Sequence, residues 1–185
     1  MLQIVIQGRG GQGAQTAGNL LAAAYFDQGL QVQCFASYGG ARRGTPVSSY
    51  LRVDERPVRL RCDIERADAI LCFDASLLEG RLLATAHAGT VIVVNSARSS
   101  DEIARAFPGL RVIALDGLSI ARSQGLGRIV NSTLLGGLAR ALQSPPLPGL
   151  LRTVGEQAPQ RREENLAACE QGYQQVDRQL AGVAP

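Results

Sequence analysis

The hydrophobic positions near the N-terminus predict a strand, a turn and a helix in quick succession. Residues 2–7 (LQIVIQ) form a short apolar run that is typical of a buried strand. Residues 12–28 then carry Ala, Leu and Tyr at helical spacing, and Gly29 follows them as a C-terminal cap. A glycine cluster with the spacing G-x-G-x-x-G joins the two elements. The first thirty residues are therefore predicted to form a strand–turn–helix unit.

Apolar runs recur along the rest of the chain, and strand-like runs alternate with helix-like ones. Strands are predicted at residues 31–36, 67–74, 89–95 and 110–116. Helices are predicted at residues 75–86, 99–107 and 126–143, the last ended by the sequence SPPLPG. Strands that alternate with helices predict an α/β fold of the Rossmann-like kind, in which a mostly parallel sheet carries helices on both faces.

Two segments depart from this alternation. The sequences VSSYLRV and VRLRC alternate apolar and polar residues around the turn DERP, which predicts an inserted antiparallel β-hairpin at residues 47–62. Residues 161–181 are predicted to form a C-terminal helix that packs on the domain's own sheet or on a partner chain. Its apolar face consists of Leu166, Cys169, Tyr173, Val176 and Leu180. A length of 185 residues favours a single domain that spans residues 1–185.

Polar residues end several of the predicted strands, at positions where functional groups of α/β proteins often gather. Asp74, Asn95 and Asp116 hold such positions, but N-capping of the helices that follow explains all three. Ser99 and Glu102 match a capping box at the start of the next predicted helix. These residues are therefore expected to be structural.

Composition restricts the chemistry that this chain can perform alone. All nineteen basic residues are arginine, so a catalytic lysine is excluded, and His87 is the one histidine. Neither a nucleophile–histidine–carboxylate set nor a G-x-S-x-G motif occurs, so no catalytic residue is predicted. The cysteines form no C-x-x-C pair, which disfavours a metal site and predicts free, largely buried thiols. They are Cys34, Cys62, Cys72 and Cys169.

Charge and hydropathy exclude two classes of partner. The net charge of +3 is small and dispersed, and no aromatic RNA-binding motif occurs, so no nucleic acid is expected. No apolar run is long enough to span a membrane, and no cationic stretch precedes the first apolar segment. The cytoplasm is the expected location.

The glycine turn is the strongest candidate for a binding site. Gly8, Gly10 and Gly13 hold the three fingerprint positions, with Gly11 and Gln12 between the last two. In a strand–turn–helix unit such glycines let the backbone approach an anionic group, and the free N–H groups at the helix start point at that group. The alternative is a tight turn whose glycines only let the helix pack closely on the sheet.

A second glycine loop, YGGARRG, follows the strand predicted at residues 31–36 and carries Arg42 and Arg43. Both loops leave the carboxyl ends of strands that are expected to be neighbours, so Arg9 in the glycine turn would add a third guanidinium group. NAD is disfavoured because no acidic residue ends the second strand. NADP and coenzyme A carry several phosphates, and both fit. For Arg42 and Arg43 the alternative is a solvated or subunit-contacting loop.

Six segments of the chain carry a likeness to a known family. In order they are GRGGQGAQTAGNLLAAA, YGGARRGTPVSSYLR, ADAILCFDASLL, GTVIVVNS, GLGRIVNSTLLGGLARAL and ENLAACEQGY. On these segments the chain resembles the gamma subunit, or gamma domain, of the 2-oxoacid:ferredoxin oxidoreductases. The likeness spans nearly the whole chain, with the mild departure that Ala75 stands where family members often carry proline.

The resemblance implies a multi-subunit enzyme that oxidatively decarboxylates a 2-oxoacid and forms acyl-coenzyme A. The candidate substrates are pyruvate, 2-ketoisovalerate, 2-oxoglutarate and aryl oxoacids. Alpha and beta subunits would hold thiamine diphosphate and Mg²⁺, and ferredoxin-like subunits would hold iron–sulfur clusters. Electrons would go to ferredoxin, or to NAD where a flavin subunit is added.

The gamma part of this family is similar to a lid that helps bind coenzyme A and closes over the thiamine site. The residues expected to contact coenzyme A are Gly8, Arg9, Gly10, Gly11, Gln12, Gly13, Arg42 and Arg43. Two other functions stay open from the sequence. One is an independent NADP-binding module, and the other is a purely structural assembly subunit.

Overall fold

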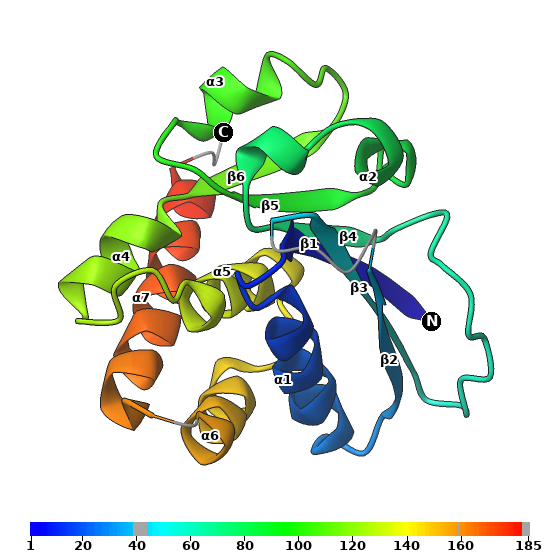
Figure 1. Cartoon of the computed structure of the whole chain (residues 1–185), viewed down its shortest axis with the longest axis horizontal. Helices are drawn as coiled ribbons and strands as arrows, with labels where there is room; N and C mark the ends of the chain where they lie inside the picture. Colours follow the sequence, from blue (N-terminus) through cyan, green and yellow to red (C-terminus); the bar gives the residue numbers. More distant parts are fainter. Residues whose placement is uncertain (39–43, 159, 183–185) are drawn as a thin grey trace.

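A computed structural model describes residues 1–38, 44–158 and 160–182, and its core is one six-stranded sheet with helices on both faces (Figure 1). The strands are β1 (Leu2–Arg9), β2 (Gln31–Tyr38), β3 (Pro46–Asp54), β4 (Ala69–Cys72), β5 (Val91–Asn95) and β6 (Arg111–Leu115). The α-helices are α1 (Ala14–Phe26), α2 (Gly80–Ala84), α3 (Ser100–Ala104), α4 (Gly117–Ser123), α5 (Asn131–Leu142), α6 (Leu147–Gln157) and α7 (Arg162–Ala181). Arg42 and Arg43 lie outside the described residues.

The strand order of the sheet is β2-β3-β1-β4-β5-β6. Strands β1, β4, β5 and β6 pair in parallel, whereas β3 is antiparallel to both β1 and β2. Strand β2 therefore runs in the same direction as β1, and β3 alone runs against the others. The predicted α/β fold with a mostly parallel, Rossmann-like sheet is confirmed.

An antiparallel hairpin exists, but its strands are β2 and β3, so the prediction of a hairpin at residues 47–62 with VRLRC as its second strand is wrong. Strand β3 pairs with β2 along its length, from Asp54 opposite Gln31 to Val47 opposite Tyr38. Its other edge pairs with β1 over eight residue pairs. Both edges of β3 are thus occupied, and VRLRC has no partner strand. Strand β3 also separates β1 from β2, so these two are not neighbours, contrary to expectation.

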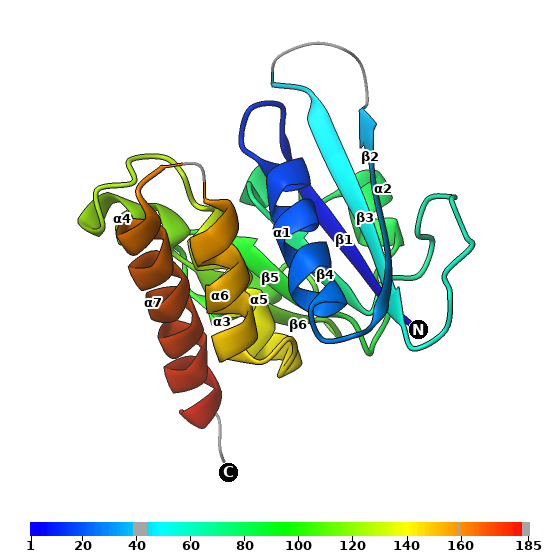
Figure 2. The same ribbon diagram turned by 90° about the horizontal axis from the view of Figure 1, so that it is seen from below.

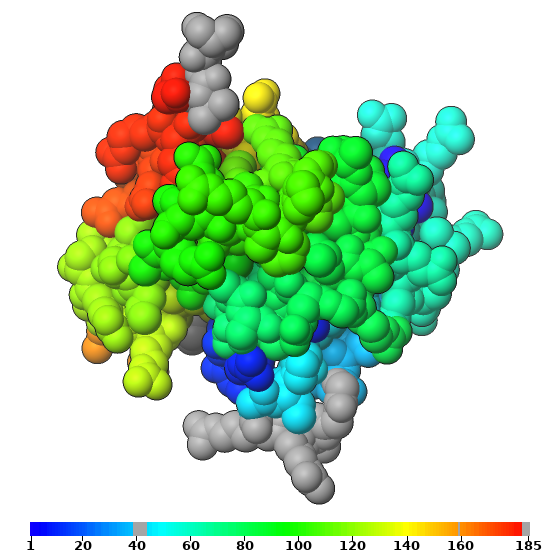
Figure 3. All heavy atoms as spheres, turned by 90° about the horizontal axis from the view of Figure 1, so that it is seen from above, coloured from blue at the N-terminus to red at the C-terminus, as the bar shows by residue number. Residues whose placement is uncertain are grey.

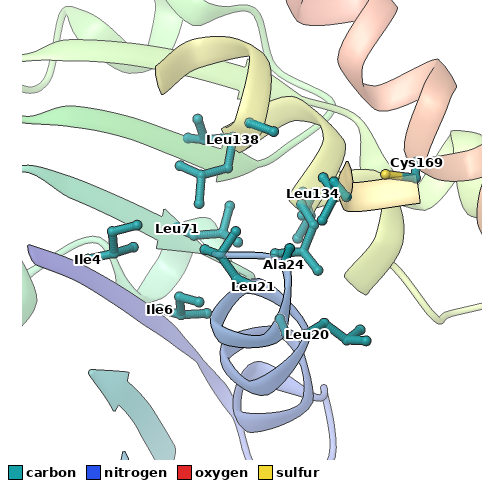
Figure 4. Close-up of a cluster of buried hydrophobic side chains, with 14 of the residues drawn as sticks. Ile4, Ile6, Leu20, Leu21, Ala24, Leu71, Leu134, Leu138 and Cys169 are labelled. Carbon is teal, nitrogen blue, oxygen red and sulfur yellow. The ribbon is translucent and has the colours of Figure 1, made fainter. Parts of the chain in front are cut away.

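Each face of the sheet buries its own hydrophobic cluster. Ile4, Ile6 and Leu71 from β1 and β4 meet Leu21 of α1 and Leu134 of α5 on one face (Figure 4). Helices α1, α6 and α7 lie side by side across this face (Figure 2). The other face packs against the short helices α2 and α3 and the segments around them. Helices on both faces were predicted from the alternation of strands and helices.

Helix α7 has nearly the predicted bounds, and it packs mainly on α5. Glycines let the two helices approach closely. A Cβ atom on Gly136 of α5 would clash with the Cys169 carbonyl, and one on Gly172 of α7 would clash with the Thr133 carbonyl. The apolar stripe of α7 is therefore covered by helices of this chain, with Cys169 and Val176 fully buried.

Other predicted helices differ from the structure at their ends. The helix predicted at 75–86 is split into a 3-10 turn (Ala75–Leu77) and the short α2, and the one predicted at 126–143 begins only at Asn131. Helices α4 and α6 were not predicted. In the part of the chain that is described, no helix combines the length and the apolar character that a membrane span needs.

Candidate functional site

The glycine turn between β1 and α1 is held by hydrogen bonds that its backbone N–H groups donate. The Arg9 N–H donates to Gln12 Oε1 at 2.6 Å, and the Gln12 N–H donates to the Arg9 carbonyl at 2.9 Å. The Gly10 N–H donates to the Thr45 carbonyl at 2.9 Å, which joins the turn to the loop before β3. Gly11 and Gly13 have φ values of +93° and +87°, a region that favours glycine. The turn thus needs glycine at these two positions.

The start of α1 has no side-chain cap. Gly13 is the N-cap residue, and no acidic residue lies in the first turn. The first intrahelical bond that closes on Gly13 comes from the Ala17 N–H, so the N–H groups of Ala14, Gln15 and Thr16 find no acceptor among the described residues. Such groups carry the positive end of the helix dipole, and they favour an anion.

A hollow of about 380 Å³ opens directly at this helix start. Its lining consists of Arg9, Gly10, Gly11, Gly13, Ala14, Gln15, Thr16, Tyr38, Thr45 and Val47. Figure 3 shows the glycine turn, in dark blue, beside the light-blue ends of β2 and β3. The described lining includes a guanidinium group but no carboxylate, so its electrostatics also favour an anion.

The glycines of the turn differ in what surrounds them. A Cβ on Gly8 would lie 3.1 Å from the Phe73 Cβ, and one on Gly13 would lie 2.5 Å from the Asn131 amide nitrogen. These two glycines let β1 and α1 pack closely against β4 and α5. Gly11 has no atom of the described residues within 4 Å of that position. Close packing therefore explains Gly8 and part of Gly13, but it does not explain Gly11.

Arg9 is fixed to the end of β4. Its Nε donates to Asp74 Oδ2 at 2.8 Å, and its Nη2 donates to Ser76 Oγ at 2.8 Å. Partial burial acts to raise the pKa of Asp74, but hydrogen bonds from Ser76 and Arg9 outweigh it, so the pKa lies below its ordinary value. From the sequence, Asp74 was predicted to have only a capping role. It does cap the 3-10 turn, by accepting the Ser76 N–H, and it also anchors Arg9.

Of the other residues predicted to cap helices, three do so and Asn95 does not. Asp116 caps α4 by accepting the Ser119 N–H, and Ser99 and Glu102 form the predicted capping box of α3. Asn95 does not cap the helix that follows it. Its Oδ1 accepts the N–H of Gly117, and its Nδ2 donates to the Phe73 carbonyl, so it ties the ends of β4 and β5 to the start of α4.

A second cavity, of about 560 Å³, lies on the other face of the sheet and was missed in the sequence analysis. Strands β1 and β3 contribute Gln7, Ser48 and Tyr50 to its wall, and Asp63 and Arg81 form an ion pair on its side at 3.5 Å. Polar side chains at alternate positions of β1 and β3 could have indicated this cavity, because the other residues of these strands have the apolar pattern of buried strands.

The cysteines are free thiols in different surroundings. Cys72 and Cys169 are buried, and burial raises the pKa of each thiol to about 12, which keeps both protonated. Cys34 is half-buried, and Cys62 is exposed, contrary to the expectation of largely buried thiols. Within the described ranges no group of three or more His, Cys, Asp or Glu side chains could hold a metal ion.

Comparison with known proteins gives consistent matches along the chain. The family model described as pyruvate ferredoxin/flavodoxin oxidoreductase matches residues 3–175. The pyruvate/ketoisovalerate oxidoreductases common subunit gamma of Thermococcus kodakarensis is 33% identical over 178 residues, which cover 94% of this chain and 96% of that protein. This chain therefore aligns with nearly the whole of a gamma subunit.

Two solved structures share the fold. The crystal structure of the pyruvate oxidoreductase subunit PORC from Thermotoga maritima has a TM-score of 0.80 at 28% identity, covering 94% of this chain and 95% of that one. The 2-oxoglutarate:ferredoxin oxidoreductase from Magnetococcus marinus, solved with 2-oxoglutarate, coenzyme A and succinyl-CoA bound, has a TM-score of 0.76 at 22% identity. That match covers 99% of this chain and 31% of the longer one, so this fold occurs there as part of a larger polypeptide.

Proposed function

The chain belongs to the pyruvate ferredoxin/flavodoxin oxidoreductase family, and from that premise we propose the task of this gamma-type subunit. It serves a thiamine diphosphate-dependent enzyme that oxidatively decarboxylates a 2-oxoacid to acyl-coenzyme A. Its own part is to bind coenzyme A and to close over the active site, with residues 1–185 acting as one gamma-type domain. Catalytic groups are supplied by other subunits.

The cofactors of the reaction belong to the partner subunits in this proposal. Following the family, we assign thiamine diphosphate and Mg²⁺ to alpha and beta subunits, and iron–sulfur clusters to ferredoxin-like subunits. In keeping with this, the described residues contain no group of three or more His, Cys, Asp or Glu side chains that could hold a metal ion. Ferredoxin, or NAD through a flavin subunit, receives the electrons.

The uncapped start of α1 is the observation that carries the proposal. Three backbone N–H groups without acceptors open on a hollow that holds no described carboxylate, and this is what a phosphate group requires. Coenzyme A is the first ligand to consider, because the Magnetococcus marinus enzyme of the same fold was solved with it bound. Strand β2 ends at Tyr38 without an acidic residue, which disfavours NAD.

Arg9 has a double role in this proposal. A guanidinium group has five N–H donors, and the described contacts to Asp74, Ser76 and Gly44 engage three of them. Two donors stay available for a phosphate oxygen while Asp74 keeps the group in place. Arg42 and Arg43 would steady a second phosphate or the partner subunit. Bound in this way, coenzyme A would be oriented with its thiol toward the active site of the partner subunits, which is a positioning contribution.

A charge placed at the helix start tests this site. Thr16 is exposed and lines the hollow in the first turn of α1, so Thr16→Glu adds a carboxylate beside the expected phosphate. We expect the apparent KM for coenzyme A of the assembled enzyme to rise roughly tenfold, because like charges repel at short range. Asn19→Glu is the matched control. It adds the same charge at an exposed position one turn further along α1, and should change KM less than about twofold.

This measurement and a thermal-stability assay of the isolated chain together separate the two rival functions. If Thr16→Glu leaves the KM for coenzyme A unchanged while the complex assembles normally, the binding role is refuted and a purely structural subunit is favoured. An isolated chain that NADP stabilises against heat, with no effect of coenzyme A, would favour the NADP-binding module.

A further inference from the structure

The segment between β3 and β4 stands off from the body of the protein, beyond the N-terminal end of β1 (Figures 1 and 2). Residues 57–62 of this segment, the docking segment, contain the VRLRC sequence that has the alternation of a strand. The structure assigns them to neither a helix nor a strand. A strand pattern without a strand partner is the starting observation.

The C-terminal end of the docking segment is fixed to the protein. Arg52 is only 2% exposed, and its Nη1 and Nη2 donate to the carbonyls of Cys62 and Asp63 at 2.8 and 3.2 Å. Just before the segment, the Arg56 N–H donates to Asp54 Oδ1 at 3.1 Å in a turn that leaves β3. The segment is therefore anchored at one end, which reduces the cost of ordering it when a partner binds.

The middle of the docking segment is open. The backbone N–H and carbonyl groups from Val58 to Arg61 make no hydrogen bond to the described part of the chain. Leu60 in the centre is 49% exposed. A free backbone ladder and an exposed apolar side chain are together the features that an added strand would cover.

The charge of the segment indicates the chemistry of the partner. Arg56, Arg59 and Arg61 are exposed, no acidic residue lies between them, and none forms an ion pair with the described residues. In a strand, Arg59 and Arg61 share one face and Leu60 lies on the other. A second copy of this chain would set arginines against arginines, which destabilises a strand pair. A nucleic acid would bind the arginines, but it would not pair with the free backbone N–H and carbonyl groups.

We propose that residues 57–62 become an additional strand in the assembled enzyme by pairing with an extended, acidic segment of a partner subunit. The inference rests on the proposed function only in that the chain works within a multi-subunit complex. The partner strand would carry Asp or Glu at alternate positions, opposite Arg59 and Arg61, and would cover Leu60.

Hydrogen exchange tests the pairing directly. Alternate amides from Val58 to Cys62 should exchange at least about tenfold more slowly in the assembled enzyme than in the isolated chain, because strand pairing protects the amides that face the partner strand. Equal exchange in the two states would overturn the proposal. Coenzyme A is not needed for this measurement, so its outcome is independent of the binding site at α1.

Charge reversal tests the chemistry of the partner. The double variant Arg59→Glu/Arg61→Glu should raise the apparent Kd for assembly at least about tenfold, whereas Arg59→Lys/Arg61→Lys should retain most of the affinity. The control is Arg105→Glu/Arg111→Glu, which reverses two exposed arginines at and near β6, the far edge of the sheet. Assembly of the first variant with wild-type affinity would refute the acidic partner. If Arg59→Glu/Arg61→Glu lost binding to nucleic acid but assembled normally, the acidic partner would also be refuted.

Discussion

Glycine has different structural roles in two regions of this molecule. In the turn before α1, Gly11 and Gly13 supply backbone conformations with positive φ, and no described residue fills the space beside Gly11. In the contact between α5 and α7, Gly136 and Gly172 are ordinary helical residues whose missing side chains let another backbone approach. The first region leaves polar groups and space unused, whereas the second uses all of its space inside the protein.

This difference separates a surface with room for a ligand from a contact that is filled by the protein itself. The N–H groups at the start of α1 have no acceptors among the described residues, and the helix itself cannot supply any. Between α5 and α7, by contrast, the buried Ser132 hydroxyl donates to Asn165 Oδ1 at 2.7 Å, although Thr133 Oγ1 is buried there without a partner among the described residues. The unused donors at the start of α1 open on a hollow, so an external anion is expected there and not between the two helices.

The largest effect is expected in the α5–α7 contact. Gly172→Ala should lower the free energy of unfolding by about 3 kcal/mol or more, because the new methyl group meets the Thr133 carbonyl and neither backbone can move freely. Chemical denaturation measures the change. Gly149→Ala in α6 is the matched control, since its nearest foreign atom is 4.0 Å from the new Cβ, and it should be neutral or slightly stabilising. Equal stabilities for the two variants would show that the helices are not held at this distance.

An intermediate effect is expected within the turn. Gly13→Ala should cost about 2 kcal/mol, because it adds contact with the Asn131 amide to the cost of a positive φ. Gly11→Ala should cost only about 1 kcal/mol, because the methyl group enters open space. Thermal unfolding of both variants gives the difference. If Gly11→Ala were the more damaging, the space beside Gly11 would not be open in solution.

The smallest effect concerns the ion pair that braces the turn. The pKa of Asp74 is depressed in the folded protein, so its contribution to stability is present above the unfolded pKa of about 4 and is lost as pH falls through the folded pKa. Asp74→Asn should therefore lower stability at pH 7 by less than about 1 kcal/mol and reduce the loss of stability below pH 4. Denaturation curves at pH 7 and pH 3 measure both changes. Glu65→Gln, an exposed carboxylate without a described ion-pair partner, is the control, and an identical pH response in both variants would contradict the role of the pair.

The sequence allowed prediction of the elements whose signals are local. The β1–α1 unit, its glycine turn and the cap at Gly29 follow from residue spacing alone, and the structure places them within a few residues of the predicted bounds. The capping box of Ser99 and Glu102 likewise requires only four consecutive residues. Such features could be predicted because the groups that stabilise them are neighbours in the chain.

Features that depend on distant residues could not be predicted. The pattern of VRLRC fits a strand, but β2 and β1 already occupy both edges of β3, which no local pattern reveals. The proline cluster at SPPLPG ends α5 and also begins α6, with Pro146 as N-cap and Pro148 in the first turn, where proline is tolerated. The partner of Arg9 is 65 residues away in the chain, so its contact with Asp74 could only come from the fold.

The close contact of α5 and α7 has a consequence for biosynthesis. Every strand of the sheet and most of the helices precede α7 in the chain, and they leave the ribosome before it. Until then, the face of α5 that contains Gly136 has no helix against it, although ten of the twelve residues of α5 are buried in the finished protein. The sheet can form during translation, but its helical cover closes only after α7 has been synthesised, and the nascent chain exposes an apolar surface for that interval.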